Sequence, residues 1–189
     1  MDNSAKKLNL GCGIDIKSGW INLDSVAIPG VDVVHDIEKL PLPFGNEAFD
    51  EILAQDVLEH VDYIPVLKDL HRILKTGGAL HIRVPHFTSK NNFVDPTHKK
   101  LFSVNTWDFF VTSPSTSKHI EKERAYYFNF AFTKKANCHI TFEKSSRIFF
   151  YNCLIEWFFN LSGKIQSFYE STGFSRFSPA ENIFVDLIK

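Results

Sequence analysis

Short apolar runs separated by polar, turn-rich segments fill the first half of the chain. Runs rich in β-branched and aliphatic side chains predict strands, and they lie at residues 7–10, 20–23, 31–35, 49–54 and 79–84. Strands that follow one another through helices or crossovers form a mainly parallel sheet. The pattern therefore predicts an α/β domain built around such a sheet.

One helix is predicted between the fourth and fifth of these strands. Apolar residues recur there at helical spacing, and Pro65 stands near the start, where a missing backbone N–H costs little. The spaced residues are Ile64, Leu67, Leu70 and Leu74. Lys75 and the pair Gly77-Gly78 predict its end, because cations and left-handed residues are typical of helix C-termini.

The second half of the chain has a different pattern. From residue 86 helix and loop signals mix, with a strand predicted near 139–142 and a final strand over 182–188. An aromatic-rich helix is predicted over 147–160. No linker-like change of composition divides the chain, so we expect one domain over 1–189. Its expected parts are a cofactor-binding half (7–85), an insertion or substrate half (86–181) and a closing strand (182–189).

Composition narrows the class of protein. The 189 residues are 44% hydrophobic and 23% charged, with a formal net charge of −1, so neither nucleic acid nor a membrane span is expected. The start, residues 1–7, lacks the apolar stretch of a secretory signal. The three cysteines form no close pair. We therefore expect a cytoplasmic protein without a disulfide framework.

Candidate chemistry lies where the predicted strands end. Gly11 and Gly13 follow the first strand, where glycine lets the backbone approach a ligand closely. Asp24 ends the second strand, where a carboxylate can accept hydrogen bonds from both ribose hydroxyls, and Asp36 ends the third. Ligands of open parallel sheets bind at the carboxyl ends of the strands, so these residues predict a nucleotide site.

The pattern disfavours NAD as that nucleotide. A dinucleotide fingerprint needs a third small residue where this chain has Ile16, and Asp15 places a negative charge where a pyrophosphate would bind. The acidic residue also comes 11 positions after Gly13, at Asp24, instead of about 20. S-adenosylmethionine has no phosphate and carries a positive sulfonium, so it suits this site better.

Several motifs together resemble class I methyltransferases. Residues 8–13 look like their first motif, residues 36–61 are similar to the type-11 methyltransferase core, and residues 74–80 match the lead into its fifth strand. Residues 19–24 and 178–183 resemble a bacterial family of predicted methyltransferases that is often associated with cell-surface glycan genes. The resemblance implies a Rossmann-like fold: a mainly parallel sheet with an antiparallel last strand and helices on both faces.

The resemblance also implies S-adenosylmethionine as the cofactor and assigns residues to it. The glycine turn would lie against the methionine part, the first carboxylate against the ribose, and the second carboxylate with its neighbour against the adenine. Two residues after the fourth strand would line the cleft. These predicted contacts are Gly11, Cys12, Gly13, Asp24, Asp36, Ile37, Gln55 and Asp56. One departure is that residues 13–19 leave little room for the usual helix between the first two strands.

The expected reaction is methyl transfer from S-adenosylmethionine to an oxygen or nitrogen of a small molecule or glycan. Residues that could contact the acceptor or take its proton are His86, Asp95 and His98, and His86 follows the fifth strand, where it should face the cleft. His60 is a further candidate, although its place at a helix start favours a structural role. Two other classes stay open: a non-catalytic S-adenosylmethionine-binding protein and an NAD(P)-type oxidoreductase.

Three further features have ordinary structural interpretations. The eight histidines show no His-x-x-x-His spacing and the cysteines no Cys-x-x-Cys spacing, so no metal site is expected. Cys12 is interpreted as a small buried hydrophobe. Aromatic stripes such as that of the helix predicted over 147–160 mostly pack on a core, which is the favoured interpretation here. Because its aromatic residues lie on more than one face, a partner surface, a homodimer contact and a site for an acyl or lipid substrate stay open as alternatives.

Overall fold

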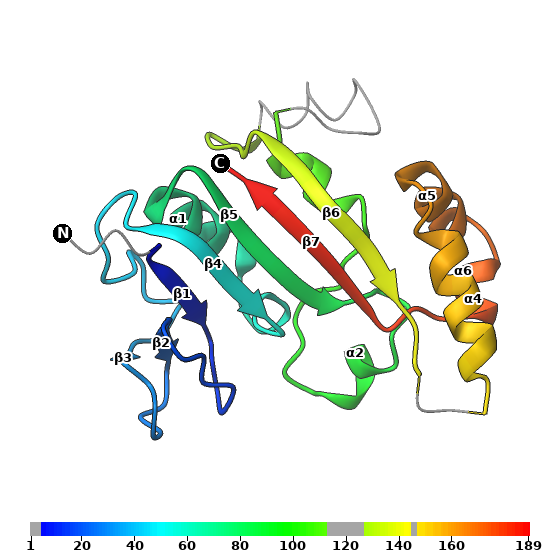
Figure 1. Cartoon of the computed structure of the whole chain (residues 1–189), viewed down its shortest axis with the longest axis horizontal. Helices are drawn as coiled ribbons and strands as arrows, with labels where there is room; N and C mark the ends of the chain where they lie inside the picture. Colours follow the sequence, from blue (N-terminus) through cyan, green and yellow to red (C-terminus); the bar gives the residue numbers. More distant parts are fainter. Residues whose placement is uncertain (1–4, 113–126, 145–146) are drawn as a thin grey trace.

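The computed structural model describes residues 5–112, 127–144 and 147–189. They form a seven-stranded sheet in the order β3-β2-β1-β4-β5-β7-β6 (Figure 1). The strands are β1 (Lys7–Leu10), β2 (Ile21–Asp24), β3 (Val33–Val34), β4 (Phe49–Gln55), β5 (Leu74–Pro85), β6 (Lys134–Thr141) and β7 (Asn182–Ile188). The helices are η1 (Leu58–His60), α1 (Tyr63–Ile73), α2 (Asn91–Val94), η2 (Thr106–Phe110), α4 (Phe149–Phe159), α5 (Gly163–Ser171) and α6 (Phe174–Phe177).

The direction of the strands confirms the predicted Rossmann-like sheet. β1 pairs in parallel with β2 and β4, β2 with β3, and β4 with β5. The last strand, β7, runs antiparallel to both of its neighbours, β5 and β6. The order reverses between β1 and β4, and ligands bind at such a switch point, outside the carboxyl ends of the strands.

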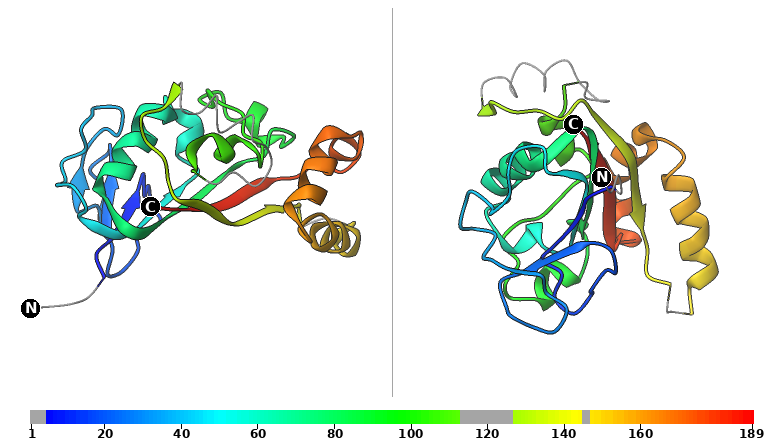
Figure 2. Two further views of the ribbon diagram at one scale, coloured as in Figure 1. Left: turned by 90° about the horizontal axis from the view of Figure 1, so that it is seen from above. Right: turned by 60° about the vertical axis from the view of Figure 1, so that its left-hand side comes forward.

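Helices are distributed unevenly over the sheet. Figure 2 shows α1 on one face, while α4 lies on the other side beside the antiparallel pair of strands β6 and β7. The expectation of helices on both faces is thus confirmed, but the expected alternation of strands and helices in the first half is wrong for residues 11–48, where no helix forms. Short loops make these connections instead, as the little room at residues 13–19 indicated.

The predicted end of the first long helix is also wrong. α1 ends at Ile73, and Leu74 already pairs with Phe49 across a register shift in β5. Gly77 and Gly78 therefore lie within β5 and do not cap the helix. Gly78 is needed for close approach of the chain: a Cβ there would lie 2.9 Å from the carbonyl oxygen of Asp50.

Fully buried side chains on the central strands hold the loops at the carboxyl ends in place. Leu8, Ile52 and Leu80 have no exposed surface, and they lie on the adjacent strands β1, β4 and β5. The insertion after β5 adds an aromatic cluster, in which the rings of Phe102 and Trp107 stack 5.3 Å apart. This packing fixes residues 86–112 beside the end of β5.

The aromatic helix, predicted over 147–160, is α4, and it lies at the periphery (Figure 1). Of its residues only Asn152 and Phe159 are buried. Its exposed large side chains are Phe149, Phe150, Tyr151, Leu154, Trp157 and Phe158. Most of these aromatics therefore lie outside the core. Within the described part of the chain, no helix is long and apolar enough to cross a membrane.

Candidate functional site

Glycine is required at the end of β1. Gly11 has a φ of +60°, and a Cβ at this position would lie 2.5 Å from Cγ2 of Val57. Gly13 also has a positive φ, of +48°, but a Cβ there would meet nothing within 4 Å. The turn thus needs glycine twice for its backbone, and at Gly11 also for the space beside Val57.

The carboxylate of Asp24 organises this turn. Its Oδ2 accepts a hydrogen bond of 2.8 Å from the backbone N–H of Gly13, and its Oδ1 accepts one of 3.0 Å from Val26. Cys12, between the two glycines, is buried, and its backbone N–H donates a hydrogen bond to the carbonyl oxygen of Leu23. Burial and then the nearby Asp24 raise the pKa of the Cys12 thiol, which agrees with its interpretation as a small hydrophobe.

A pocket of about 340 Å³, here called the cofactor pocket, opens at these strand ends. It brings together predicted cofactor contacts from four separate segments. Its lining residues are Gly11, Asp24, Ser25, Asp36, Ile37, Glu38, Asp56, Val57, His60 and Val61. The lining thus has four carboxylates and, among the described residues, neither lysine nor arginine. Such a pocket suits a cationic ligand with hydroxyl groups and disfavours a phosphate.

Gln55 is not part of this pocket, contrary to expectation. Because side chains alternate along a strand, Gln55 lies on the same face of the sheet as Leu53, away from the cofactor pocket. The two residues line a separate hollow with Phe184. Asp56 follows it with a φ of +51°, lines the cofactor pocket and forms an ion pair with Arg83. Sequence reasoning missed Ser25, Glu38, Val57 and Val61, since only the fold brings these loops together.

A second pocket, of about 390 Å³, adjoins the first and is here called the acceptor pocket. Its lining is mostly polar and comes from the loop after β4, from η1, from the ends of β5 and β7, and from residues 91–98. It consists of Asp56, Glu59, His60, Arg83, Pro85, Asn91, Val94, Asp95, His98 and Asn182. Asp56 and His60 line both pockets, so ligands in the two pockets would be neighbours.

Glu59 is the unusual residue of the acceptor pocket. It has no exposed surface, and within the described part of the chain neither of its carboxylate oxygens has a hydrogen-bond partner. Burial raises its pKa to about 7. A buried, unsatisfied carboxyl is costly to a fold, so its presence in a pocket indicates a functional role.

His60, Thr97, Asp95 and His98 form a connected group at the edge of this pocket. Nδ1 of His60 lies 2.7 Å from the Thr97 hydroxyl, which donates a 2.6 Å hydrogen bond to Asp95. The rings of His60 and His98 meet edge to face, 4.7 Å apart. Bonds from Thr97 lower the pKa of Asp95, whereas burial and then His98 lower the pKa of His60. Asp95 is thus ionised and His60 neutral near pH 7.

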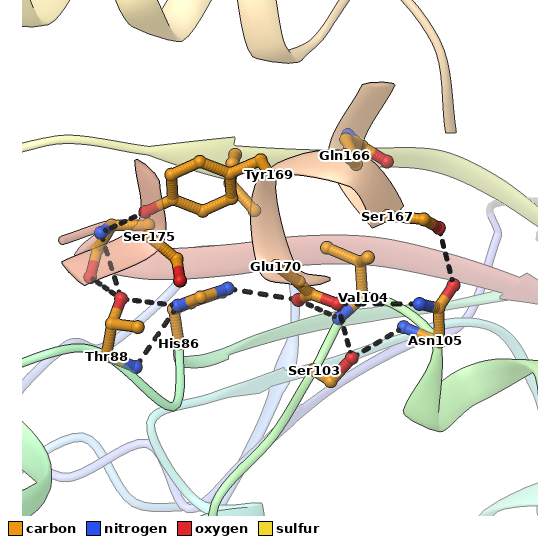
Figure 3. Close-up of polar contacts among 12 residues, drawn as sticks. His86, Thr88, Ser103, Val104, Asn105, Gln166, Ser167, Tyr169, Glu170 and Ser175 are labelled. Carbon is orange, nitrogen blue, oxygen red and sulfur yellow. Dashed lines mark hydrogen bonds and ion pairs between the residues drawn. The ribbon is translucent and has the colours of Figure 1, made fainter. Parts of the chain in front are cut away.

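The structure corrects the prediction for His86. This side chain has no exposed surface and lines neither pocket, because its Nε2 lies 3.0 Å from Oε1 of Glu170 (Figure 3). Its Nδ1 lies 2.7 Å from the hydroxyl of Thr88. Glu170 also accepts hydrogen bonds from Ser103 and from the backbone of Val104. His86 therefore orders the insertion, while Asp95 and His98 do line the acceptor pocket.

Comparison with known proteins agrees with this geometry. Residues 4–82, less than half of the chain, match the model of the methyltransferase domain family. A 45-residue segment is 47% identical to an uncharacterized protein of Methanocaldococcus jannaschii and covers 24% of this chain and 20% of that protein. A 72-residue segment is 29% identical to demethylmenaquinone methyltransferase of Lysinibacillus sphaericus and covers 36% and 30%. These matches thus span less than a third of each curated relative's length.

Solved structures extend the similarity to nearly the whole chain. A methyltransferase dependent on S-adenosylmethionine from Archaeoglobus fulgidus matches 98% of this chain and 86% of its own, with a TM-score of 0.56 and 17% identity. Another from Thermotoga maritima matches 98% and 82%, with a TM-score of 0.53 and 18% identity. Residues 4–82 thus resemble a methyltransferase domain, and the chain shares the Rossmann-like fold of these two solved structures.

Proposed function

We propose that this chain transfers a methyl group from S-adenosylmethionine to an oxygen or nitrogen of a small-molecule or glycan acceptor. The observation that carries the proposal is the pair of adjoining pockets, which share Asp56 and His60 at the carboxyl ends of the strands. One pocket has the acidic lining that suits the cofactor, and the other has a polar lining that suits a hydroxyl-rich acceptor.

The residues of the cofactor pocket fit S-adenosylmethionine better than a dinucleotide. Asp24 ends β2 and retains lone pairs beyond the two backbone N–H groups that it accepts, so it can bind ribose hydroxyls. No lysine or arginine of the described chain lines this pocket, and three cations just outside it, Lys39, Arg83 and Lys99, pair with three of its four carboxylates. A pyrophosphate would have to compete with those carboxylates for the cations. When bound, this cofactor supplies an electrophilic methyl group on a positive sulfonium.

The chain's own residues would act mainly by positioning. An acceptor lying across Asn91, Asp95 and His98 faces Asp56 and His60, the residues common to both pockets. Alignment of the acceptor lone pair with the methyl group supplies much of the acceleration of an in-line displacement. As the bond to the methyl forms and the bond from methyl to sulfur breaks, the acceptor loses its proton, and Asp95, which lines the pocket and is partly exposed, can pass this proton to water.

Calorimetry with S-adenosylmethionine, S-adenosylhomocysteine and NAD tests the cofactor assignment. We expect both sulfur compounds to bind, NAD not to bind, and Asp24→Ala to weaken binding by more than tenfold, about 1.4 kcal/mol. Asp15→Ala is the matched control, because this carboxylate lies near the same turn but outside the pocket lining. Binding of NAD alone would favour the oxidoreductase, and no binding of either sulfur compound to folded protein would refute the proposal.

Turnover separates an enzyme from a non-catalytic binding protein. S-adenosylhomocysteine formation is measured with a panel of sugars, polyols and primary amines, for the natural chain and for His98→Ala. We expect activity on at least one class, lost in His98→Ala while cofactor affinity is retained, because His98 does not line the cofactor pocket. Cofactor binding without turnover on any acceptor would support the non-catalytic alternative.

A further inference from the structure

Three metal-binding side chains meet in the acceptor pocket, although no motif spacing predicts them. The backbone N–H of Lys99 donates a 2.7 Å hydrogen bond to the carbonyl oxygen of Glu59. This contact holds the loop that carries His98 against the helix that carries Glu59 and His60. One potential ligand atom from each of these three side chains lies within 4.8 Å of the others.

Two of the three side chains are buried with unsatisfied polar atoms. Both carboxylate oxygens of Glu59 and Nδ1 of His98 have no hydrogen-bond partner within the described part of the chain. Glu59 has no exposed surface, and the His98 side chain is 6% exposed. Buried polar groups are normally hydrogen-bonded or coordinate a metal ion, so these atoms point to a missing ligand.

The third side chain, His60, is held in a tautomer that can bind a metal ion through Nε2. The Thr97 hydroxyl has one hydrogen, and it donates this hydrogen to Oδ1 of Asp95. Thr97 must therefore accept from Nδ1–H of His60, which leaves the lone pair of a neutral ring on Nε2. Histidine ligands of metals are commonly oriented in this way, by a hydrogen bond at the other ring nitrogen.

We propose that Glu59, His60 and His98 bind a divalent first-row transition-metal ion in the acceptor pocket. Two imidazole nitrogens and one carboxylate oxygen favour Zn²⁺, Fe²⁺ or Mn²⁺ over Ca²⁺, which prefers oxygen ligands alone. Asp95 acts outside the ligand set, through Thr97 on His60 and at 3.9 Å from Nε2 of His98. All three side chains line the acceptor pocket, so an acceptor oxygen in that pocket could complete the coordination.

The role of the ion rests on the proposed function. A hydroxyl bound to a divalent cation loses its proton more easily. The oxygen lone pair then forms the bond to the methyl group while the bond from methyl to sulfur breaks, and the proton passes through Asp95 to water. Asp95 suits this role because its side chain is 45% exposed and lines the pocket. The ion would thus favour oxygen acceptors over amines.

Metal binding to untagged, metal-free protein tests the site without any need for turnover. Zn²⁺ affinity is measured by calorimetry, and Co²⁺ serves as a spectroscopic probe of nitrogen ligands. We expect one ion per chain. His98→Ala and Glu59→Gln should each weaken binding at least as much as the loss of an outer partner does, about 10- to 100-fold. His139→Ala is the matched control, because this histidine lies on β6, outside the cluster.

Folding and function are controlled separately. Thermal melting and S-adenosylhomocysteine binding in EDTA verify that each variant is folded, and Glu59→Gln preserves the side-chain shape if His98→Ala does not fold. Affinity for Zn²⁺ that is equal in the natural chain, Glu59→Gln and His98→Ala would overturn the proposal, as would the absence of binding. Metal binding that persists in a protein unable to bind S-adenosylhomocysteine would refute the proposed function and leave the metal site standing.

Discussion

Replacement of Gly11 by alanine should damage both stability and cofactor binding, and Gly13 provides an internal comparison. Both glycines lie in the turn after β1 with positive φ, at +60° and +48°. They differ in the space around them, because a Cβ at Gly11 would lie 2.5 Å from Cγ2 of Val57, whereas a Cβ at Gly13 would meet nothing within 4 Å. The two substitutions therefore share the backbone strain but not the clash.

The structure gives the size of each effect. A non-glycine residue in the left-handed region costs about 1–2 kcal/mol, which is the whole expected loss for Gly13→Ala. At Gly11 the clash adds about 1–3 kcal/mol, the usual cost of overpacking a filled site. The nearest atoms belong to a short, branched side chain close to its own backbone, so Val57 can move only by shifting the loop. Because Val57 lines the cofactor pocket, that shift should also weaken cofactor binding.

Urea unfolding, followed by circular dichroism, and calorimetry with S-adenosylhomocysteine measure the two effects. We expect Gly11→Ala to lose more unfolding free energy and more affinity than Gly13→Ala. The double variant Gly11→Ala/Val57→Ala should recover part of the difference, because it removes the methyl groups that clash. Equal losses for the two single variants, or no recovery in the double variant, would refute the steric argument.

Three other predictions concern the buried contact between His86 and Glu170, the buried carboxyl of Glu59, and the exposed aromatic helix α4. His86→Ala should lower the unfolding free energy by about 1–3 kcal/mol, because it leaves Glu170 with an unpaired lone pair, yet S-adenosylhomocysteine affinity of the folded variant should not change. In EDTA the raised pKa of Glu59 should make the unfolding free energy of the natural chain fall, relative to that of Glu59→Gln, as pH rises from about 4.5 to about 7, because the folded protein holds this proton more tightly than the unfolded chain. Urea titrations of the two proteins should differ by about 3 kcal/mol over this range, whereas the lowered pKa values of His60 and His71 act in the opposite direction on both; identical profiles would contradict this. The homodimer contact left open for the aromatic helix corresponds to a dimer mass in light scattering, and Trp157→Glu, at a side chain 63% exposed, should then give monomers; a monomeric natural chain would contradict this alternative.

Local sequence patterns predicted the strand bounds well where the apolar run coincides with the segment that pairs in the sheet. The first and last strands were predicted with the bounds observed in β1 and β7, since both are runs of apolar residues bounded by polar segments. The end of α1 was predicted too late, because Leu74 pairs with Phe49 and this contact between distant segments overrides the local helix signal. The short helices α5 and α6 were missed, as their packing contributes more than their weak periodicity.

In the candidate site, too, contacts between segments far apart in the sequence could not be predicted from local patterns. Strand-end residues such as Asp24 and Asp36 were found because a parallel sheet brings all its carboxyl ends to one edge. His86 also follows a strand end, but its side chain turns to Glu170, which is 84 positions away in the chain. The proximity of Glu59 and His98 likewise depends on the hydrogen bond from the backbone N–H of Lys99 to the carbonyl oxygen of Glu59. No spacing in the sequence predicts this contact.

The wall shared by the two pockets has a consequence for the order of events. Asp56 and His60 line both pockets, so under the proposed function a shift of either residue caused by one ligand would change the binding of the other. Such coupling is reciprocal: the factor by which the bound cofactor changes acceptor affinity is also the factor by which the acceptor changes cofactor affinity. Demethylated cofactor and methylated product would share this coupling, so each product would influence the release of the other.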